Sequence, residues 1–316
     1  MDGRNPLPLP VLLTNYKIKN MLRDECSWFR SRSYLHFDVP VGLKQALKVV
    51  SNPQAVALHS FHPFIHFAIT QKKIKFNKDI GAIESTEKLR PIAYASHMDA
   101  HIYSYYSERL SELYEAEVRK RNIQENVIAF RALGKSNVDF AHQAFVDIEN
   151  QAPCSAIALD ITKFFDTLDY QILKDQLTGL LQVSRLPQDY YNLFKSVTRF
   201  AQVNRDDLYK LFGISTHNPK AGRYRVCKPK EFRDVVRGGG HIVVNEAEKG
   251  IPQGSPISSL LSNIYMLEFD SSVASTVADV GGKYYRYCDD ILCIVPSQFK
   301  GYVARTHFIN SNCITH

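Results

Sequence analysis

The sequence predicts an α+β fold in which helices back an antiparallel sheet. Residues 101–121 carry apolar side chains at three- and four-residue spacing, the period of a long amphipathic helix. Residues 154–162 alternate large apolar and small side chains, the two-residue period of a strand. Residues 283–295 form two strand-like halves around a polar dipeptide, as in a β-hairpin. Helices and antiparallel strands in one chain favour packing in layers.

Further helices are expected on both sides of the 154–162 strand. Asn137 and Asp169 can each cap a helix, and Pro256 suits a first helical turn. The expected ranges are 41–50, a stretch from 137 onwards, 169–183, 188–202 and 256–267.

Three histidines lie in the apolar stretch HSFHPFIHFAIT. His59, His62 and His66 allow a metal site, but the interleaved aromatic and aliphatic residues favour histidines packed in a core. The charged segment that follows, 72–79, is expected to be a mobile loop.

Composition sets limits on the class of protein. The 316 residues are 45% hydrophobic, enough to bury a core and to build two or three subdomains. There is no apolar window of about 18 residues and no secretory signal, so we expect no membrane association. Six scattered cysteines without a C-x-x-C pair favour a reducing, cytoplasmic setting. The net charge of +7 is compatible with a polyanionic partner and with an ordinary basic protein.

Three acids lie at the ends of predicted strands. Asp160 belongs to the alternating run, and Asp289 and Asp290 form the tip of the hairpin. A hairpin tip usually carries Asn-Gly or Asp-Gly, and adjacent acids repel each other unless a cation compensates. A plain exposed turn is the alternative for an isolated Asp-Asp pair. Three carboxylates from two strands can instead hold two Mg²⁺ ions that promote phosphoryl transfer.

A glycine- and proline-bounded turn, GIPQGSP, leads into the helix expected at 256–267. Backbone of this kind can approach a ligand closely, and the Gln253 amide can both donate and accept hydrogen bonds. A purely structural turn is the alternative.

A basic segment lies within the predicted insertion at 203–249. Its cations, interleaved with Tyr224 and Phe232, are Arg223, Arg225, Lys228, Lys230 and Arg233. Such a surface can neutralise phosphates and stack against bases, although a solvated insertion would have the same composition. Three glycines at 238–240 are expected to join two β-like pieces, RDVVR and HIVVN.

Taken in order, ALDITKFFDTLD, GIPQGSPISSLLSNIYM and YRYCDDILCIV resemble motifs A, B and C of the palm of reverse transcriptases. The likeness covers about residues 85 to 296, and KLRPIAYASHMDAHIYSYYSERL resembles the fingers of group II intron and retron enzymes. AFRALGKSNVDFAHQAF and CKPKEFRDVVRGGG resemble the antiviral, defence-associated reverse transcriptases. The resemblance implies a right-hand polymerase with fingers and a palm.

The resemblance also implies roles at the metal site. Asp160 and Asp289 would bind two Mg²⁺ ions, with Mn²⁺ as a substitute. Asp290 would complete the acidic cluster, and the Ile161 carbonyl would lie near the second ion. Phe165 falls where the family keeps a bulky steric gate that collides with a ribose 2′-hydroxyl. A core phenylalanine beside Phe164 is the alternative.

Other roles concern the nucleotide and the primer. Gln253, helped by Gly254, would contact the incoming nucleotide. Lys88 and Arg90 would grip its triphosphate from the fingers, although an exposed basic pair is the alternative. Tyr287 would support the hairpin and the primer end.

We therefore expect fingers in 1–152 and a palm in 153–316 that carries the 203–249 insertion. Only about twenty residues follow Val295, too few for the helical thumb of the family, so a thumb is expected to be absent from this chain.

The predicted function is RNA-directed DNA polymerisation, with an RNA template, deoxynucleotides and a DNA product, in phage defence with a dedicated non-coding RNA. Two alternatives remain at this stage. An RNA-dependent RNA polymerase would use Asp160 and Asp166 as its paired acids. A nucleic-acid-binding module derived from a polymerase would not need the acids. Nothing in the sequence assigns the primer or the oligomeric state.

Overall fold

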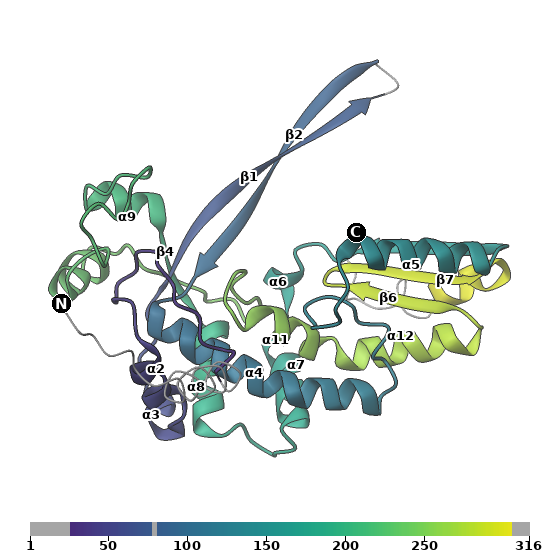
Figure 1. The fold of residues 1–316 in the computed structure, drawn as a ribbon, viewed down its shortest axis with the longest axis horizontal. Helices are drawn as coiled ribbons and strands as arrows, with labels where there is room; N and C mark the ends of the chain where they lie inside the picture. The colour runs from purple at the N-terminus through teal and green to yellow at the C-terminus, as the bar shows by residue number, and fades with distance from the viewer. Residues whose placement is uncertain (1–25, 78–80, 305–316) are drawn as a thin grey trace, which may run out of the picture.

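The computed structural model describes residues 26–77 and 81–304, and it contains two sheets joined by helices (Figure 1). One sheet has the strand order β2-β1-β4-β5, and the other has the order β3-β7-β6. Among the described residues, no helix combines the length and the apolar character that crossing a membrane requires. The expectations about the N-terminal leader and about the chain after residue 304, including the missing thumb, lie outside the described residues.

The first sheet is dominated by a long hairpin that projects from the rest of the molecule (Figure 1). Strand β1, Phe64–Asn77, pairs antiparallel with β2, Ala82–Tyr94, from Ile65 opposite Tyr94 to Asn77 opposite Ala82. The prediction of a loop at 72–79 was wrong for 72–77, which is strand. The charged residues there alternate with the β-formers Ile74 and Phe76, and cross-strand pairing decides the structure.

Cross-strand pairing gives the hairpin two different faces. Ile74, Phe76, Ile83 and Leu89 share one face, and each is 63–73% exposed. Because successive strand residues point to opposite faces, Lys88 lies on the other face. One face of the hairpin therefore carries these apolar residues together with the Lys72–Glu87 ion pair, and the opposite face carries Lys88.

A helical core lies at the base of this hairpin. Helix α4 starts at His97, earlier than predicted, because the Ser96 hydroxyl accepts from the Asp99 amide. The helices around this core are α2 (Leu43–Val50), α3 (Pro53–Ala57), α4 (His97–Lys120), α7 (Tyr170–Leu180), α8 (Gln188–Thr198) and α11 (Ser258–Tyr265). Tyr103, Leu110 and Tyr114 of α4 are at most 1% exposed and join the largest hydrophobic cluster.

The histidine-rich stretch takes a structural role. His59 Nε2 lies 2.6 Å from Oδ1 of the buried Asp99, and the His62 amide donates to Oδ2 of the same carboxylate at 2.9 Å. Burial lowers the pKa of His66. In the described part of the chain no group of three or more His, Cys, Asp or Glu side chains could hold a metal ion. The contacts with Asp99 support packing as the interpretation of His59 and His62.

Segment 201–249 folds against the first sheet, although it follows the strand Cys154–Asp160, which belongs to the second sheet, in sequence. Its elements are β4 (Ala201–Asn204), α9 (Arg205–Leu211), α10 (Pro229–Glu231), the π-helix η1 (Phe232–Arg237) and β5 (Val243–Val244). Strand β4 runs parallel to β1 and antiparallel to β5. The β-like interpretation of RDVVR was wrong, because Pro229 begins a helical turn there and Val236 is the residue that the fold buries.

The second sheet lies between two helices (Figure 1). Its strands are β3 (Cys154–Asp160), β6 (Lys283–Tyr287) and β7 (Asp290–Pro296), all antiparallel, and β6 and β7 form the predicted hairpin. Tyr284 of β6 faces helix α12, Leu267–Asp279, whereas its neighbour Tyr285 donates to Asp147 of helix α5, Asn137–Asn150. The predicted antiparallel sheet backed by helices is present.

Short elements complete this half. They are α6 (Phe164–Thr167), the 3-10 turn η2 (Ser297–Phe299) and α13 (Lys300–Ala304). Asn137 was predicted to cap helix α5, but Ser136 is the cap. Its hydroxyl accepts from the Asp139 amide, and the Asp139 carboxylate accepts from the Ser136 amide, which together form a capping box.

Candidate active site

The three acids meet where β3 ends beside the turn of the β6–β7 hairpin. Asp160 pairs directly with Asp290 across β3 and β7, so their side chains share one face of the sheet. The Ile161 amide donates to the Asp289 carbonyl at 3.0 Å, which attaches the hairpin turn to the end of β3. Asp160 and Asp290 are exposed and Asp289 is partly buried.

The electrostatics of this group agree with the geometry. Burial raises the pKa of Asp290 above its ordinary value, the negative charges of Asp289 and Asp160 raise it further, and the Lys88 ammonium acts in the opposite direction. Asp290 therefore lies within electrostatic reach of both Asp289 and Asp160. Their repulsion favours a bound cation, which would offset their charge.

The number and placement of these carboxylates determine which kind of metal site they can form. Across residues 26–77 and 81–304, no group of three or more acidic, His or Cys side chains is arranged to hold a metal ion by itself, and this includes the three acids. Mg²⁺ in phosphoryl-transfer sites keeps waters and takes substrate oxygens beside one or two carboxylates. An exposed cross-strand pair with a third acid in the next turn fits that incomplete coordination, and it does not fit a closed structural metal site.

Backbone hydrogen bonds join the GIPQGSP turn to two other parts of the chain. The Gly250 amide donates to the Leu168 carbonyl and the Ile251 amide to the Phe165 carbonyl, both at 2.8 Å. The Ala93 amide of β2 donates to the Gln253 carbonyl, also at 2.8 Å. The turn thus connects the residues that follow Asp160 with the base of the projecting hairpin.

Gly254 makes the close approach to β2 possible. Its φ is +105°, and a Cβ at this position would lie 2.7 Å from the Ala93 carbonyl oxygen. A side chain at Gly254 would therefore clash with backbone and strain its own dihedrals. The family resemblance implies that this glycine lies beside the nucleotide, and in the structure it lies against Ala93 and Ile92 of β2.

Two phenylalanines follow β3 and differ in burial. Phe164 is 4% exposed and lies in the core, and its ring centroid is 5.6 Å from that of Phe165. Phe165 is only partly buried. Its carbonyl holds the Ile251 amide, so the residue lies between the acids and the GIPQGSP turn.

The remaining predicted residues divide into two regions. Lys88 acts electrostatically on Asp290, and Arg90 shares its hairpin face and is exposed. Tyr287 shares a sheet face with Asp290, and its hydroxyl donates to Asn137 Oδ1 at 2.8 Å.

The basic set lies instead in the 201–249 segment, around α10 and η1. Tyr224 there is 77% exposed, and an Arg223 guanidinium nitrogen donates to the Phe212 carbonyl. None of the contacts that define the acid site involves this set, which is Arg223, Arg225, Lys228, Lys230 and Arg233.

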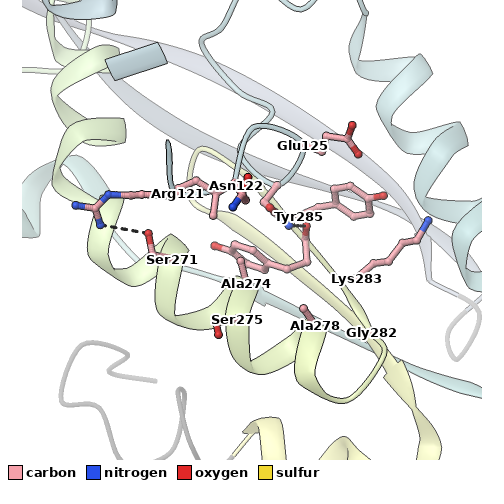
Figure 2. Close-up of a pocket in the computed structure, with 13 residues that line it drawn as sticks. Arg121, Asn122, Glu125, Ser271, Ala274, Ser275, Ala278, Gly282, Lys283 and Tyr285 are labelled. Atoms are coloured by element: carbon pink, nitrogen blue, oxygen red, sulfur yellow. Dashed lines mark hydrogen bonds between the residues drawn. The ribbon is translucent and has the colours of Figure 1, made fainter. Parts of the chain in front are cut away.

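A cavity of about 380 Å³ lies between α12, β6 and the 121–126 segment (Figure 2). Ser271, Ala274 and Ala278 of α12 form one wall, and Lys283 and Tyr285 of β6 contribute to another. The acids do not line it, so the cavity is separate from the predicted site.

Sequence reasoning missed one pair beside the site, Arg286 and Asp270. Both side chains are fully buried, and Arg286 Nη2 lies 2.6 Å from Asp270 Oδ2. The signal in the sequence was an arginine two residues after Tyr284. This spacing places both side chains on the sheet face that meets α12. A buried arginine needs an acidic partner, but the sequence did not indicate which helix would supply it.

Comparison with known proteins agrees with the arrangement. The family model described as "Reverse transcriptase (RNA-dependent DNA polymerase)" matches residues 72–307. No curated protein matches the chain.

Several solved structures are similar at low sequence identity. Apo telomerase from Candida tropicalis, truncated from its C-terminal domain, is 11% identical with a TM-score of 0.41, over 78% of this chain and 48% of that chain. Telomerase from Candida albicans in complex with a fragment of telomeric RNA is 11% identical with a TM-score of 0.38, over 93% of this chain and 48% of that one. A partial Cas6-RT-Cas1–Cas2 complex is 15% identical with a TM-score of 0.37, over 83% and 35%. The chain spans about half the length of the telomerase chains.

Proposed function

Because the chain belongs to the reverse transcriptase (RNA-dependent DNA polymerase) family, we propose that it adds deoxynucleotides to a primer 3′-hydroxyl on an RNA template. The observation that supports this most is the cross-strand pair of Asp160 and Asp290, with Asp289 in the adjoining turn. Lys88 acts electrostatically on Asp290, and the turn that carries Gln253 is hydrogen-bonded to the Phe165 carbonyl. A cation and an amide are residue types that a nucleoside triphosphate site uses.

We assign the metal-binding role to Asp160, Asp289 and Asp290, with the Ile161 carbonyl near the second ion. Two Mg²⁺ ions, or Mn²⁺ in their place, would activate the primer hydroxyl and stabilise the departing pyrophosphate. The exposed Asp160 and Asp290 leave room for water and phosphate oxygens on the ions. Tyr287 would hold the hairpin at the primer end, through its hydrogen bond to Asn137.

The protein side of nucleotide binding falls to residues from three elements. Lys88 and Arg90 on the hairpin would bind the triphosphate. Gln253 and Gly254 would contact the incoming nucleotide from the turn that packs against β2. Phe165, partly buried at the start of α6, would exclude a ribose 2′-hydroxyl.

The basic segment supplies a second contact for nucleic acid. Its cations, Arg223, Arg225, Lys228, Lys230 and Arg233, accompany the exposed Tyr224 in a folded unit attached to the first sheet. Positive charge with an exposed aromatic ring suits an RNA backbone and an unpaired base. We place the fingers in 1–152 and the palm in 153–316. The basic segment would then be the part of the palm region that packs on the sheet of the fingers.

Incubation of the purified chain with primed RNA and each nucleotide set in turn tests the activity. Incorporation of deoxynucleotides is expected, at least about tenfold faster than ribonucleotides. Incorporation of ribonucleotides alone would identify an RNA-dependent RNA polymerase. RNA binding without any incorporation would favour a binding module derived from a polymerase.

For the biological role, we propose antiviral defence against phage, with a dedicated non-coding RNA as template. It is supported by the resemblance of 129–145 and 227–240 to the defence-associated enzymes. Sequencing of nucleic acid that co-purifies with the chain from infected cells should return DNA complementary to one RNA. Protection that survives deletion of any adjacent RNA gene would contradict this role.

A further inference from the structure

The buried ion pair between Arg286 of β6 and Asp270 of α12 lies directly behind the acidic turn. Arg286 Nε donates to Asp270 Oδ1 at 2.7 Å and Nη2 donates to Oδ2 at 2.6 Å, so both carboxylate oxygens are held. The Tyr284 hydroxyl adds a third hydrogen bond, to Oδ1 at 2.7 Å. Both charged side chains are fully buried.

The third guanidinium nitrogen connects this pair to the site. Arg286 Nη1 donates to the Cys288 carbonyl at 3.0 Å. That carbonyl belongs to the peptide group just before Asp289. The carbonyl of Asp289 itself, in the next peptide group, accepts from the Ile161 amide at 3.0 Å.

These two hydrogen bonds together restrain the Asp289 carboxylate. Each peptide group is planar, so fixing the peptide on either side of the Asp289 Cα fixes the direction of its Cβ. The turn needs such restraint, because Cys288 has a φ of +60°, a conformation that non-glycine residues rarely adopt. Without these two hydrogen bonds, only the pairing of β6 with β7 would hold the turn.

Stability alone does not explain the pair. Removing two charges from water carries a desolvation penalty that the attraction of the pair offsets only in part, and apolar replacements of similar volume are often as stable. An apolar side chain could not donate a hydrogen bond to the Cys288 carbonyl. The guanidinium does so while Asp270 holds the same group in place through two further hydrogen bonds.

We propose that Asp270 and Arg286 are positioning residues that set the direction of the Asp289 carboxylate. Both side chains are fully buried, so neither is open to a nucleotide or a primer. This inference rests on the proposed polymerase function for its kinetic consequence, but its structural consequence, a fixed turn, can be measured without catalysis.

Two variants test the role. Asp270→Leu with Arg286→Met removes both charges together, so no orphan charge stays buried, and Arg286→Lys keeps the charge but cannot hold Asp270 and Cys288 at once. We expect hydrogen exchange of the Ile161 amide to accelerate about tenfold or more in both variants. We expect Mn²⁺ binding to the nucleic-acid-free chain, by calorimetry, to weaken. The turnover number should fall about 10- to 100-fold while the deoxynucleotide KM and the RNA affinity change less than threefold.

Helix α12 offers a matched control. Glu268 pairs with Arg121 at 2.8 Å, and Arg121 also donates to Ser271 (Figure 2). Glu268→Gln removes an ion pair from the same helix without touching the turn. It should leave Ile161 exchange and turnover unchanged.

The outcomes separate the two proposals. Unchanged Ile161 exchange and unchanged Mn²⁺ affinity in folded Arg286→Lys would overturn the positioning role, as would unchanged exchange in a folded double variant. If the double variant does not fold, Arg286→Lys alone decides. If the wild-type chain does not polymerise, the proposed function fails, while the exchange and Mn²⁺ measurements still test positioning.

Discussion

Replacement of Gly254 by alanine should disrupt the joint between the GIPQGSP turn and strand β2. The new Cβ would lie 2.7 Å from the Ala93 carbonyl oxygen and 3.2 Å from Ile92 Cγ2. The φ of +105° lies outside the left-handed region near +60° that alanine can reach. Backbone strain of about 1–3 kcal/mol and overpacking of about 1–3 kcal/mol together predict a loss of roughly 2–6 kcal/mol in the free energy of unfolding.

Gly213→Ala is the matched control, because Gly213 has a φ of +61° and no heavy atom within 4 Å of its Cβ position. It should lose only about 1–2 kcal/mol from the left-handed backbone. Urea denaturation of both variants gives the two free energies, and primer extension on the folded fraction gives the deoxynucleotide KM. The KM should rise only in Gly254→Ala. Equal destabilisation by the two variants would refute the argument that a backbone clash at β2 decides the effect.

Three further predictions concern selectivity, charge and pH. Phe165→Ala should lower the preference for deoxynucleotides over ribonucleotides at least about tenfold, measured as the ratio of kcat/KM values; an unchanged ratio would favour a core role for this ring. Lys88→Gln should raise the deoxynucleotide KM about tenfold, whereas Lys72→Gln, on the opposite face of the hairpin and 68% exposed, should not; equal effects would place the triphosphate elsewhere. Hydrogen bonds from Arg131 hold the pKa of Glu115 below its ordinary value of 4.5. The stabilisation is therefore present above pH 4.5 and lost as pH falls through the lower folded value. The difference in urea midpoint between wild type and Glu115→Gln should shrink at low pH, and a constant difference from pH 7 to pH 3 would argue against this ion pair.

Local pattern was sufficient for much of the palm. The alternation of 154–162 predicted β3, and the two apolar halves around Asp289 and Asp290 predicted the β6–β7 hairpin. The order of the three motifs then indicated that Asp160 meets the hairpin. Strand pairing of Asp160 with Asp290 shows the same juxtaposition.

Elements defined by distant partners were not predictable in the same way. Lys72 to Asn77 reads as a charged loop until β2 provides a partner strand for it. The segment RDVVR alternates like a strand, but Pro229 and the local helical turn override that pattern. Arg286 and Asp270 are 16 residues apart, and only the packing of α12 on β6 identifies them as a pair.

Primer extension by Asp289→Asn tests the central claim most directly. The substitution keeps the size of the side chain and removes one negative charge from the acid group, so extension with deoxynucleotides on primed RNA should fall at least about 100-fold. RNA affinity should stay unchanged. Asp279→Asn, at the exposed end of α12 away from the acids, should extend primers like the wild type. Extension by Asp289→Asn at the rate of Asp279→Asn would contradict the assignment of the three acids as the centre of a polymerase.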